Sequence, residues 1–300
     1  MATLYSEQSA SIHRTWFLMG GFLVLVIAVG FAISWYYRSP IILYGAIAFA
    51  LIMNVWSYWY SDRVVLSMTG AHKATREQYF DFYTVTENLA LTAGLPKPAL
   101  YVIDDPAPNA FATGRDEKHA VVCATTGLLS IMSRPELEGV IAHELSHIKN
   151  RDILLMTVAV VLAGFLAILS DIFLQMTFFG GGGRDREGGN QITIILAIVG
   201  IILAPFAAQL IQLAISRKRE FLADASGALL TRYPEGLASA LQKIGSYGKP
   251  MRKQSHATAH LFIGNPSGSK PGGYSGWIER MFSTHPPIKD RVAALLATSR

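Results

Sequence analysis

The architecture follows from residues 133–163, which read SRPELEGVIAHELSHIKNRDILLMTVAVVLA. The first half of this stretch mixes charged residues with an apolar stripe, whereas the second half, from Ile153 onward, carries no charge. The apolar run continues over 153–179 and is interrupted only by Asp171. At about 1.5 Å per helical residue it can cross a hydrocarbon layer about 30 Å thick. The chain therefore passes here from a water-exposed helix into a membrane-spanning one.

Three further runs have the same character. Residues 15–37 and 39–61 are uncharged and are separated by a very short link, so they predict a helical hairpin. Residues 191–216 form a fourth run, and Pro205 within it is acceptable because neighbouring membrane helices can satisfy the freed carbonyl. One such run alone could be a buried core helix or, at the amino terminus, a cleaved signal peptide. Four runs, with the second directly behind the first, favour a multi-pass membrane protein.

The composition agrees with a membrane protein. Of the 300 residues, 51% are hydrophobic and 16% are charged, whereas soluble domains carry about 25% charged residues. This hydrophobicity excludes a disordered chain. The single cysteine, Cys123, excludes an intramolecular disulfide framework and a four-cysteine metal site. The net charge is +5. We find no nucleic-acid motif, expect no nucleic-acid partner, and assign the positive charge to membrane topology and contact with anionic lipid.

The orientation follows from basic residues at the ends of the spans, which collect on the cytoplasmic side. One side carries Arg14, Arg63, Lys73, Arg76, Lys149, Arg151, Arg217, Lys218 and Arg219, and the other carries only Arg38, Arg184 and Arg186. The richer side is therefore predicted to be cytoplasmic. Segments 62–152 and 217–300 would then face the cytoplasm together.

The two polar segments predict a mixture of helices and strands. In the first segment we expect a helix over 77–92, strands at 99–103 and 119–124, a loop over 106–114 that leads into an extended piece, and a helix from Ser133. Ser133 and Glu136 match a capping box at the start of that helix. In the second segment we expect a helical continuation of the fourth span to about Thr231, a helix over 234–247, a loop over 248–276 and a final helix over 286–298.

The chemistry lies on the helix that begins at Ser133, where residues 143–147 read HELSH. Positions i and i+4 share one face of a helix, so His143 and His147 can converge on one ion. Glu144 lies beside them, where it can act on a water molecule at that ion, as in zinc proteases. Taken alone, the motif could also be two surface histidines with an ordinary glutamate, but its place on a capped amphipathic helix favours the metal site.

A third ligand is expected from residues 216–228, SRKREFLADASGA. Glu220 and Asp224 are four residues apart and share a helix face. Glu220 can bind the ion, and Asp224 can accept an N–H from a ligand histidine and so fix its tautomer. Glu220 could instead be an exposed partner of Arg217. Its large separation from His147 is explained if spans three and four are inserted between two metal-bearing helices, because an even number of crossings returns the chain to the same side.

At these residues the chain resembles the HtpX-type membrane zinc metalloproteases, a family that also includes the CAAX prenyl proteases. The resemblance rests on NAFATG at 109–114, HELSH at 143–147, SRKREFLAD at 216–224, and STHPP at 283–287 with Arg291, together with four spans in matching places. It covers essentially the whole chain. The prenyl proteases have more membrane spans and fit less well.

The resemblance implies a mainly α integral membrane protein with four transmembrane helices and a cytoplasmic α+β zincin-like (gluzincin) protease domain, split by the second helix pair. The chain then divides into an N-terminal transmembrane hairpin (1–61), a first part of the catalytic domain with the motif helix (62–152), a second hairpin (153–216), and a second part of the catalytic domain with the third zinc ligand (217–300).

The resemblance also assigns roles to residues. It implies one Zn2+ per chain, bound by His143, His147 and Glu220, with Glu144 as the catalytic carboxylate. It suggests that the segment at Asn109 forms an edge that holds the substrate backbone. It further suggests that His285 and Arg291 lie near the cleft and help to stabilise the oxyanion. From the sequence alone, His285 could equally belong to a helix-start turn, and Arg291 could pair with a carboxylate.

The implied function is that of a zinc-dependent endopeptidase that hydrolyses misfolded or damaged membrane proteins in quality control and stress response. Its expected location is the bacterial inner membrane, with protein substrates and the lipid bilayer as partners; the oligomeric state is left open. Alternatives are a CAAX-type prenyl-protein protease and a non-catalytic zinc-binding scaffold. An intramembrane site-2-type protease is disfavoured because the motif helix carries Glu136, Glu138 and Lys149.

His256 and His260 lack a carboxylate at a matching offset, so we expect no second metal site there.

Overall fold

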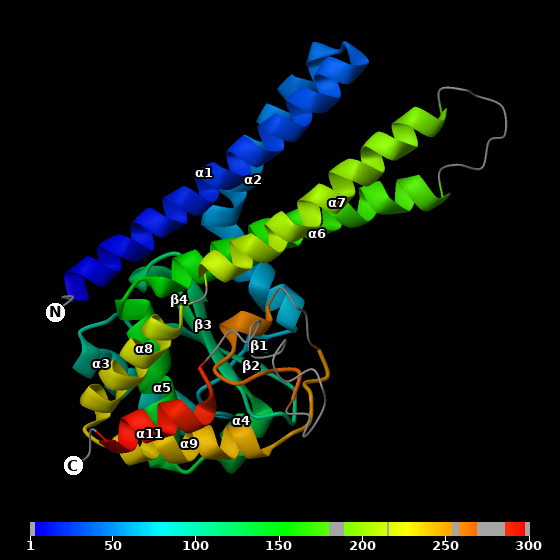
Figure 1. Cartoon of the computed structure of the whole chain (residues 1–300). Helices are drawn as coiled ribbons and strands as arrows, with labels where there is room; N and C mark the ends of the chain where they lie inside the picture. Colours follow the sequence, from blue (N-terminus) through cyan, green and yellow to red (C-terminus); the bar gives the residue numbers. More distant parts are fainter. Residues whose placement is uncertain (1–3, 180–188, 215, 254–257, 269–285, 298–300) are drawn as a thin grey trace.

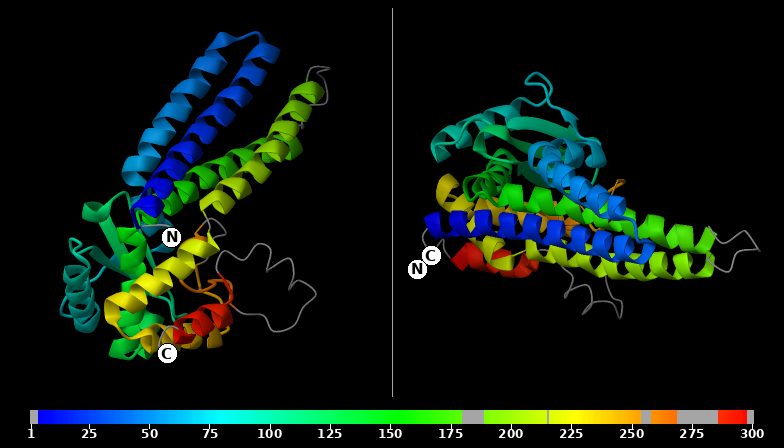
Figure 2. Two further views of the ribbon diagram at one scale, coloured as in Figure 1. Left: turned by 60° about the vertical axis from the view of Figure 1, so that its left-hand side comes forward. Right: turned by 90° about the horizontal axis from the view of Figure 1, so that it is seen from above.

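The computed structural model describes residues 4–179, 189–214, 216–253, 258–268 and 286–297. Figure 1 shows two long helical hairpins that project from a body containing the sheet and the shorter helices. The hairpins lie against each other where they meet the body and diverge toward their far ends, as the turned views of Figure 2 also show. Within the described residues the protein is mainly helical, in agreement with the predicted fold class.

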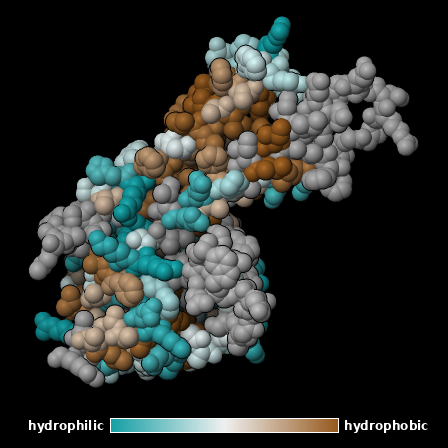
Figure 3. Space-filling model, viewed as in Figure 1, coloured by the Kyte–Doolittle hydropathy of each residue, from teal (hydrophilic) through white to brown (hydrophobic). Residues whose placement is uncertain are grey.

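Within the part of the chain that the structure describes, four helices are long and apolar enough to cross a membrane, as the sequence predicts. They are α1 (Leu4–Tyr37), α2 (Pro40–Thr69), α6 (Asp152–Phe179) and α7 (Gly189–Ala214). Their shared core includes Leu18, Phe22, Leu162 and Leu166. Large apolar side chains remain on the outside, for example Trp35, which is 77% exposed. Figure 3 shows this apolar surface gathered on the hairpin of α1 and α2, and a mixed, more hydrophilic surface on the body. Such a distribution fits contact with lipid around the hairpins.

Two of these helices extend past their predicted spans. α1 begins at Leu4, well before the expected start at residue 15, and α2 runs beyond residue 61 to Thr69, where Gly70 ends it with φ of 71°. Charged residues mark the point at which a chain leaves the hydrocarbon, but backbone hydrogen bonds can continue the helix into water. The extensions bring α1 and α2 into contact with the body of the molecule.

The described residues form one sheet of four strands in the order β1-β2-β4-β3. The strands are β1 (His72–Lys73), β2 (Ala99–Ile103), β3 (Ala110–Gly114) and β4 (Ala120–Thr125). β2 and β4 are parallel, and the other two pairs are antiparallel. β3 therefore lies at an edge. The strands at 99–103 and 119–124 are confirmed. The loop over 106–114 was predicted wrongly in its second half, because residues 110–114 pair with β4 and form β3, and the two-residue β1 was not expected.

Both faces of the sheet are covered, because successive side chains of a strand point to opposite sides. Ala112 and Val122 pack with the helices of the body. Phe111 and Cys123 point to the other side. There they belong to one cluster with Val65 of α2 and with Met156 and Val160 of α6. The sheet is thus held between the body helices and the inner ends of two membrane helices.

The remaining helices are α3 (Phe80–Ala93), α4 (Thr126–Ile131), α5 (Arg134–Lys149), α8 (Arg217–Thr231), α9 (Pro234–Ser246) and α11 (Ile288–Ala297), with short 3-10 turns at Glu117–His119 and Ala259–Leu261. Among these helices, α3, α5, α9 and α11 follow the predictions with small shifts in their ends, whereas α4 was not predicted and α8 differs from its prediction. At the start of α5 the backbone N–H of Ser133 donates to the Glu136 carboxylate at 2.7 Å, the bond that a capping box requires.

The predicted helical continuation of the fourth span was wrong. α8 is not a continuation of the fourth span but a separate helix that begins at Arg217. The backbone of Ser216 is extended, with φ of −153° and ψ of 111°. This break allows α8 to turn away from α7 and pack along α5 (Figure 1). The sequence across this point, AISRKRE at 214–220, contains no proline or glycine and so gives no local sign of the break.

Candidate metal centre

The centre forms where α5 and α8 cross. α5 is buried along most of its length, including the whole of residues 139–148. α8 approaches its backbone closely at Gly227, where an added Cβ would lie 3.0 Å from the backbone nitrogen of His143. A glycine therefore permits the short distance between the two helices. The side chain of Glu220, two turns before Gly227 on α8, reaches the face of α5 that carries the motif.

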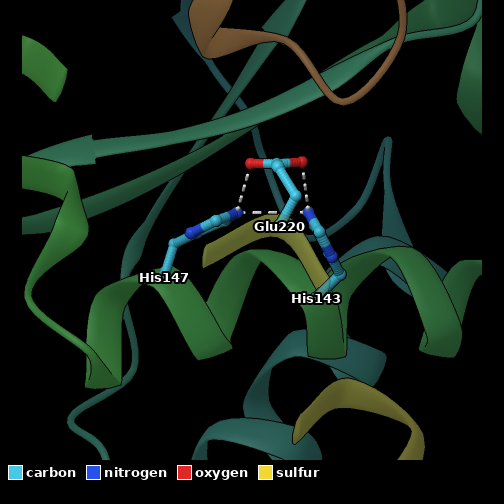
Figure 4. A group of neighbouring side chains, drawn as sticks. All are labelled: His143, His147 and Glu220. Atoms are coloured by element: carbon cyan, nitrogen blue, oxygen red, sulfur yellow. Dashed lines mark hydrogen bonds and ion pairs between the residues drawn. The ribbon is translucent and has the colours of Figure 1, made fainter. Parts of the chain in front are cut away.

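His143, His147 and Glu220 converge from the two helices, and all three are at most 5% exposed. The two Nε2 atoms lie 3.2 Å apart. The Glu220 carboxylate spans both rings, with Oε1 3.4 Å from Nε2 of His147 and Oε2 3.9 Å from Nε2 of His143. Figure 4 shows the carboxylate facing the two imidazoles across a shared point. Three protein donors thus surround one position.

Each histidine has a carboxylate on its other ring nitrogen. Oδ1 of Asp224 lies 2.9 Å from Nδ1 of His143, and Oδ2 of Asp152 lies 3.3 Å from Nδ1 of His147. These carboxylates favour the tautomer with a proton on Nδ1 and a lone pair on Nε2. The lone pairs of both rings are then directed toward Glu220. This is the arrangement that metal-binding histidines commonly have.

The donor set fits a metal ion. The three ligand atoms lie within 4.8 Å of one another, close enough for one cation to contact all three. Two imidazoles and a carboxylate are the ligands of many catalytic zinc sites, which keep a further position open. Among the described residues, His143, His147 and Glu220 form the cluster whose ligand atoms lie close enough together to hold a metal ion. His260 is buried elsewhere, and His256 lies outside the described residues.

Glu144 is buried beside the ligands and is 2% exposed. Burial raises its pKa, and the negative charge of Glu220 acts in the same direction. The positive charges of His147 and Arg291, and a hydrogen bond from the backbone N–H of Ala112, lower it again, so that the pKa is about 7. A carboxylate with this pKa can take up and release a proton near neutral pH.

The two histidines differ in their electrostatic surroundings. Burial lowers the pKa of His143 to about 4, a change that Asp224 only partly opposes. For His147, burial also lowers the pKa, but Asp152 and Glu220 outweigh it and raise the pKa to about 10. The negative charge that holds a proton on His147 would equally favour a divalent cation at its Nε2 atom.

The sheet edge next to the centre is partly covered by another segment of the chain. On the outer side of β3, the backbone N–H of Ile263 donates to the carbonyl of Ala110 at 2.9 Å. The side chain of Asn109 bonds both backbone groups of Gly264, each at 2.9 Å. Asn109 is 2% exposed, so its side chain fastens this segment to the strand. Whether this edge holds a substrate backbone stays a prediction.

Arg291 of α11 lies behind the ligands and is fully buried. It makes a two-point ion pair with Asp224, at 2.8 and 2.6 Å, and lies 3.6 Å from Oε2 of Glu220. Its predicted part in stabilising an oxyanion stays a prediction. His285 lies outside the described residues.

The sequence interpretation missed two groups of the centre. Asp152 was treated only as the boundary of a membrane span, yet it contacts His147. An acidic residue in the first turn of the helix directly after the motif was the signal available. No sequence signal predicts that the backbone N–H of Ala112 contacts Glu144, because the direction of this N–H depends on which edge of β3 pairs with β4.

Comparison with known proteins places this geometry in context. Residues 79–299 match peptidase family M48. The chain is 47% identical over 299 residues to a protein of Caldanaerobacter subterraneus subsp. tengcongensis named "Protease HtpX homolog", covering 98% of this chain and 97% of that protein. Proteins of the same name from Thermoanaerobacter pseudethanolicus and Pyrococcus furiosus are each 46% identical and cover 98% and 94% of this chain, and 97% and 94% of their own lengths.

Among solved structures, the crystal structure of S. mikatae Ste24p has a TM-score of 0.51. The two chains share 18% identity, and the match covers 95% of this chain and 64% of that protein. At this identity the similarity concerns the fold alone.

Proposed function

Because the chain belongs to peptidase family M48, we propose that it hydrolyses peptide bonds with a zinc ion held by His143, His147 and Glu220. It is a multi-pass membrane metalloprotease, and its relatives carry the name of HtpX proteases. The observation that carries the zinc proposal is the convergence of three buried donors from α5 and α8 on one point, with Glu144 beside them.

The protein groups divide the work between binding and proton transfer. When bound, zinc would supply Lewis acidity and would lower the pKa of a water molecule to about 7. Asp224 and Asp152 hold the histidine rings so that both Nε2 atoms face Glu220. The carboxylate of Glu144 accepts a proton from the attacking water and later donates it to the nitrogen of the leaving amine. Burial of the site excludes bulk water and keeps these charges effective.

We further propose that the substrates are membrane proteins, including misfolded or damaged ones, cleaved close to the bilayer. The support is the position of β3. Thr113 of this strand lies 2.9 Å, hydroxyl to hydroxyl, from Thr157 of α6. The guanidinium of Arg115, just after the strand, lies 4.7 Å from the ring centre of Trp59 on α2. One end of the edge strand therefore lies beside the membrane helices, where a segment emerging from lipid would first arrive.

The topology belongs to the same proposal. The charge asymmetry of the span ends favours a catalytic domain in the cytoplasm and a location in the bacterial inner membrane. The catalytic domain would consist of 62–152 and 217–300, interrupted by the second hairpin. The packing of α5 on α8 and α9 supports the joining of these two segments.

The test compares purified full-length protein with Glu144→Gln. We expect equal zinc content in both and a loss of casein cleavage of about 10²- to 10⁴-fold in the variant, the range for a general base. Glu138→Gln, at a partly exposed position of the same helix, is the matched control and should retain activity. Wild-type protein without zinc, or Glu144→Gln with the full rate, would contradict the proposal. Zinc without any cleavage in the wild type would instead favour a scaffold.

A further inference from the structure

Asp152 is the meeting point of three distant parts of the chain. Its Oδ2 atom faces Nδ1 of His147 at 3.3 Å on α5. Its Oδ1 atom accepts a hydrogen bond from the hydroxyl of Ser11 on α1 at 2.7 Å and lies 3.5 Å from Nε of Arg219 on α8. Asp152 and Ser11 are each 1% exposed. A side chain of the first membrane helix is therefore linked through one carboxylate to a metal ligand.

The amino-terminal end of α1 is fixed to the motif helix at a second point. One turn before Ser11, the side-chain amide of Gln8 donates to the backbone carbonyl of Lys149 at 2.7 Å. Lys149 is the last residue of α5, and carbonyls at a helix end lack partners within the helix. Figure 1 shows this end of α1 lying beside the body of the molecule. The part of α1 that precedes the predicted span thus contacts the helix that carries both histidines.

Ser11 has a definite physical effect on Asp152. A buried carboxylate must have its oxygens satisfied, and the charged groups around it determine its orientation. With Ser11 in place, Oδ1 is held by a short bond while Oδ2 faces His147. Without the hydroxyl, the remaining attraction on Oδ1 comes from Arg219, and the carboxylate can turn toward that guanidinium. Such a turn would draw Oδ2 away from Nδ1 of His147.

We propose that Ser11 is a positioning residue of the metal centre, which holds Asp152 against His147 and thereby makes zinc affinity depend on the docking of the first membrane helix. The inference rests on the proposed zinc site. It adds that the amino-terminal hairpin is more than an anchor, because its removal or displacement would loosen a ligand.

The experiment measures the zinc dissociation constant of full-length protein in detergent by competition with a chromophoric chelator. Ser11→Ala should bind zinc about 2- to 10-fold more weakly, the equivalent of one net hydrogen bond. Asp152→Asn should bind it about 10- to 100-fold more weakly, as found for partners of metal-bound histidines. Thr15→Val is the matched control: Thr15 is equally buried, one turn further along α1, and its hydroxyl bonds the carbonyl of Ser11 within the helix. It should leave zinc affinity unchanged.

A double-mutant cycle shows whether Ser11 acts through Asp152. In the Asp152→Asn background, Ser11→Ala should weaken zinc binding no further. The inference would be overturned if Ser11→Ala weakened zinc binding equally in the wild-type and Asp152→Asn backgrounds, or if Ser11→Ala alone did not weaken it. In either case, zinc binding by the wild type would leave the proposed function intact. A lower melting temperature of the zinc-free Ser11→Ala protein with unchanged zinc affinity would likewise overturn the inference, since it would show a purely structural role. Failure of the wild type to bind zinc would overturn the proposed function as well.

Discussion

Arg291 and Asp224 form a fully buried two-point ion pair in which Nε lies 2.8 Å from Oδ2 and a terminal nitrogen lies 2.6 Å from Oδ1. Asp224 in turn faces Nδ1 of His143 at 2.9 Å. The last described helix, α11, is therefore joined through one carboxylate to a proposed metal ligand. Arg291 keeps Asp224 charged, since the pair lowers the pKa of that carboxyl group against the opposing effect of burial.

This pair predicts the behaviour of Arg291 variants. Arg291→Ala leaves a buried carboxylate without its cation and should lower the free energy of unfolding by about 3–5 kcal/mol. Arg291→Lys keeps the charge but cannot make the two-point contact, so it should weaken zinc binding with a smaller loss of stability. Zinc competition and chemical unfolding provide the measurements, with the exposed Lys289→Ala on the same helix as control. A variant with a reduced kcat but native zinc affinity would support an oxyanion role instead.

Gly227 sets the distance between α8 and α5. A methyl group there would lie 3.0 Å from the backbone nitrogen of His143 and 3.2 Å from the carbonyl carbon of Ala142, and a helix backbone cannot easily yield. Gly227→Ala should therefore push Glu220 away from the histidines, reduce zinc affinity and cost about 1–3 kcal/mol of stability. The control is Gly164→Ala on α6, where an added Cβ meets nothing within 4 Å. Native zinc affinity in Gly227→Ala would show that α8 can shift without moving its ligand.

Asn109 holds the segment at Ile263 and Gly264 on the outer side of β3. Asn109→Ala removes both side-chain bonds and should speed hydrogen exchange at the amide of Gly264 and raise KM more than it changes kcat, because the edge loses its fixed geometry. Peptide-resolved exchange and steady-state kinetics check this, with the exposed Asn88→Ala as control. Protection of Gly264 at the wild-type level would mean that other contacts hold the segment.

Glu136 links the start of α5 to α9. Burial by itself raises the pKa of Glu136, but hydrogen bonds from Lys243, Ser239 and Ser133 outweigh it and lower the pKa to about 2, from an ordinary value of 4.5. A carboxyl group whose pKa is depressed by folding stabilises the protein above the unfolded-state value, and this contribution is lost as the pH falls toward the folded-state value. The contribution should therefore be complete above about pH 4.5 and should decline between that pH and about 2.

The corresponding experiment compares Glu136→Gln with Glu138→Gln, a partly exposed neighbour paired with Arg134 at 3.4 Å. Thermal unfolding in detergent should show a lower melting temperature for Glu136→Gln at pH 7 and a shrinking difference from wild type below pH 4.5. Glu138→Gln should match the wild type throughout. A difference that persists unchanged in acid would show that the side chain acts by packing and not by charge.

The close partners within the site differ in how far the sequence reveals them. The i, i+4 spacing of His143 and His147 is sufficient to place them together, because helix geometry is fixed by hydrogen bonds between near neighbours. Glu220 required a topological argument, and the structure brings it to the pair. Ser11 was missed because no periodicity connects residues so far apart in the chain. Asp152 lies only five residues after His147 but on the next helix, so its contact depends on the angle between α5 and α6. The direction of Arg291 likewise depends on how α11 packs against α8.

The sequence by itself determined the four long apolar helices, their hairpin pairing and the motif helix, because the thickness of the hydrocarbon layer and the period of the helix act on consecutive residues. Only the tertiary structure decided where α7 ends and α8 turns back along α5, which edge of the sheet is β3, and which carboxylate faces which imidazole. The packing of α8 on α5 joins segments separated by two membrane helices, while the sheet order and the Asp152 contact depend on how neighbouring elements turn against each other. Their energies come from contacts that exist only once the helices have met.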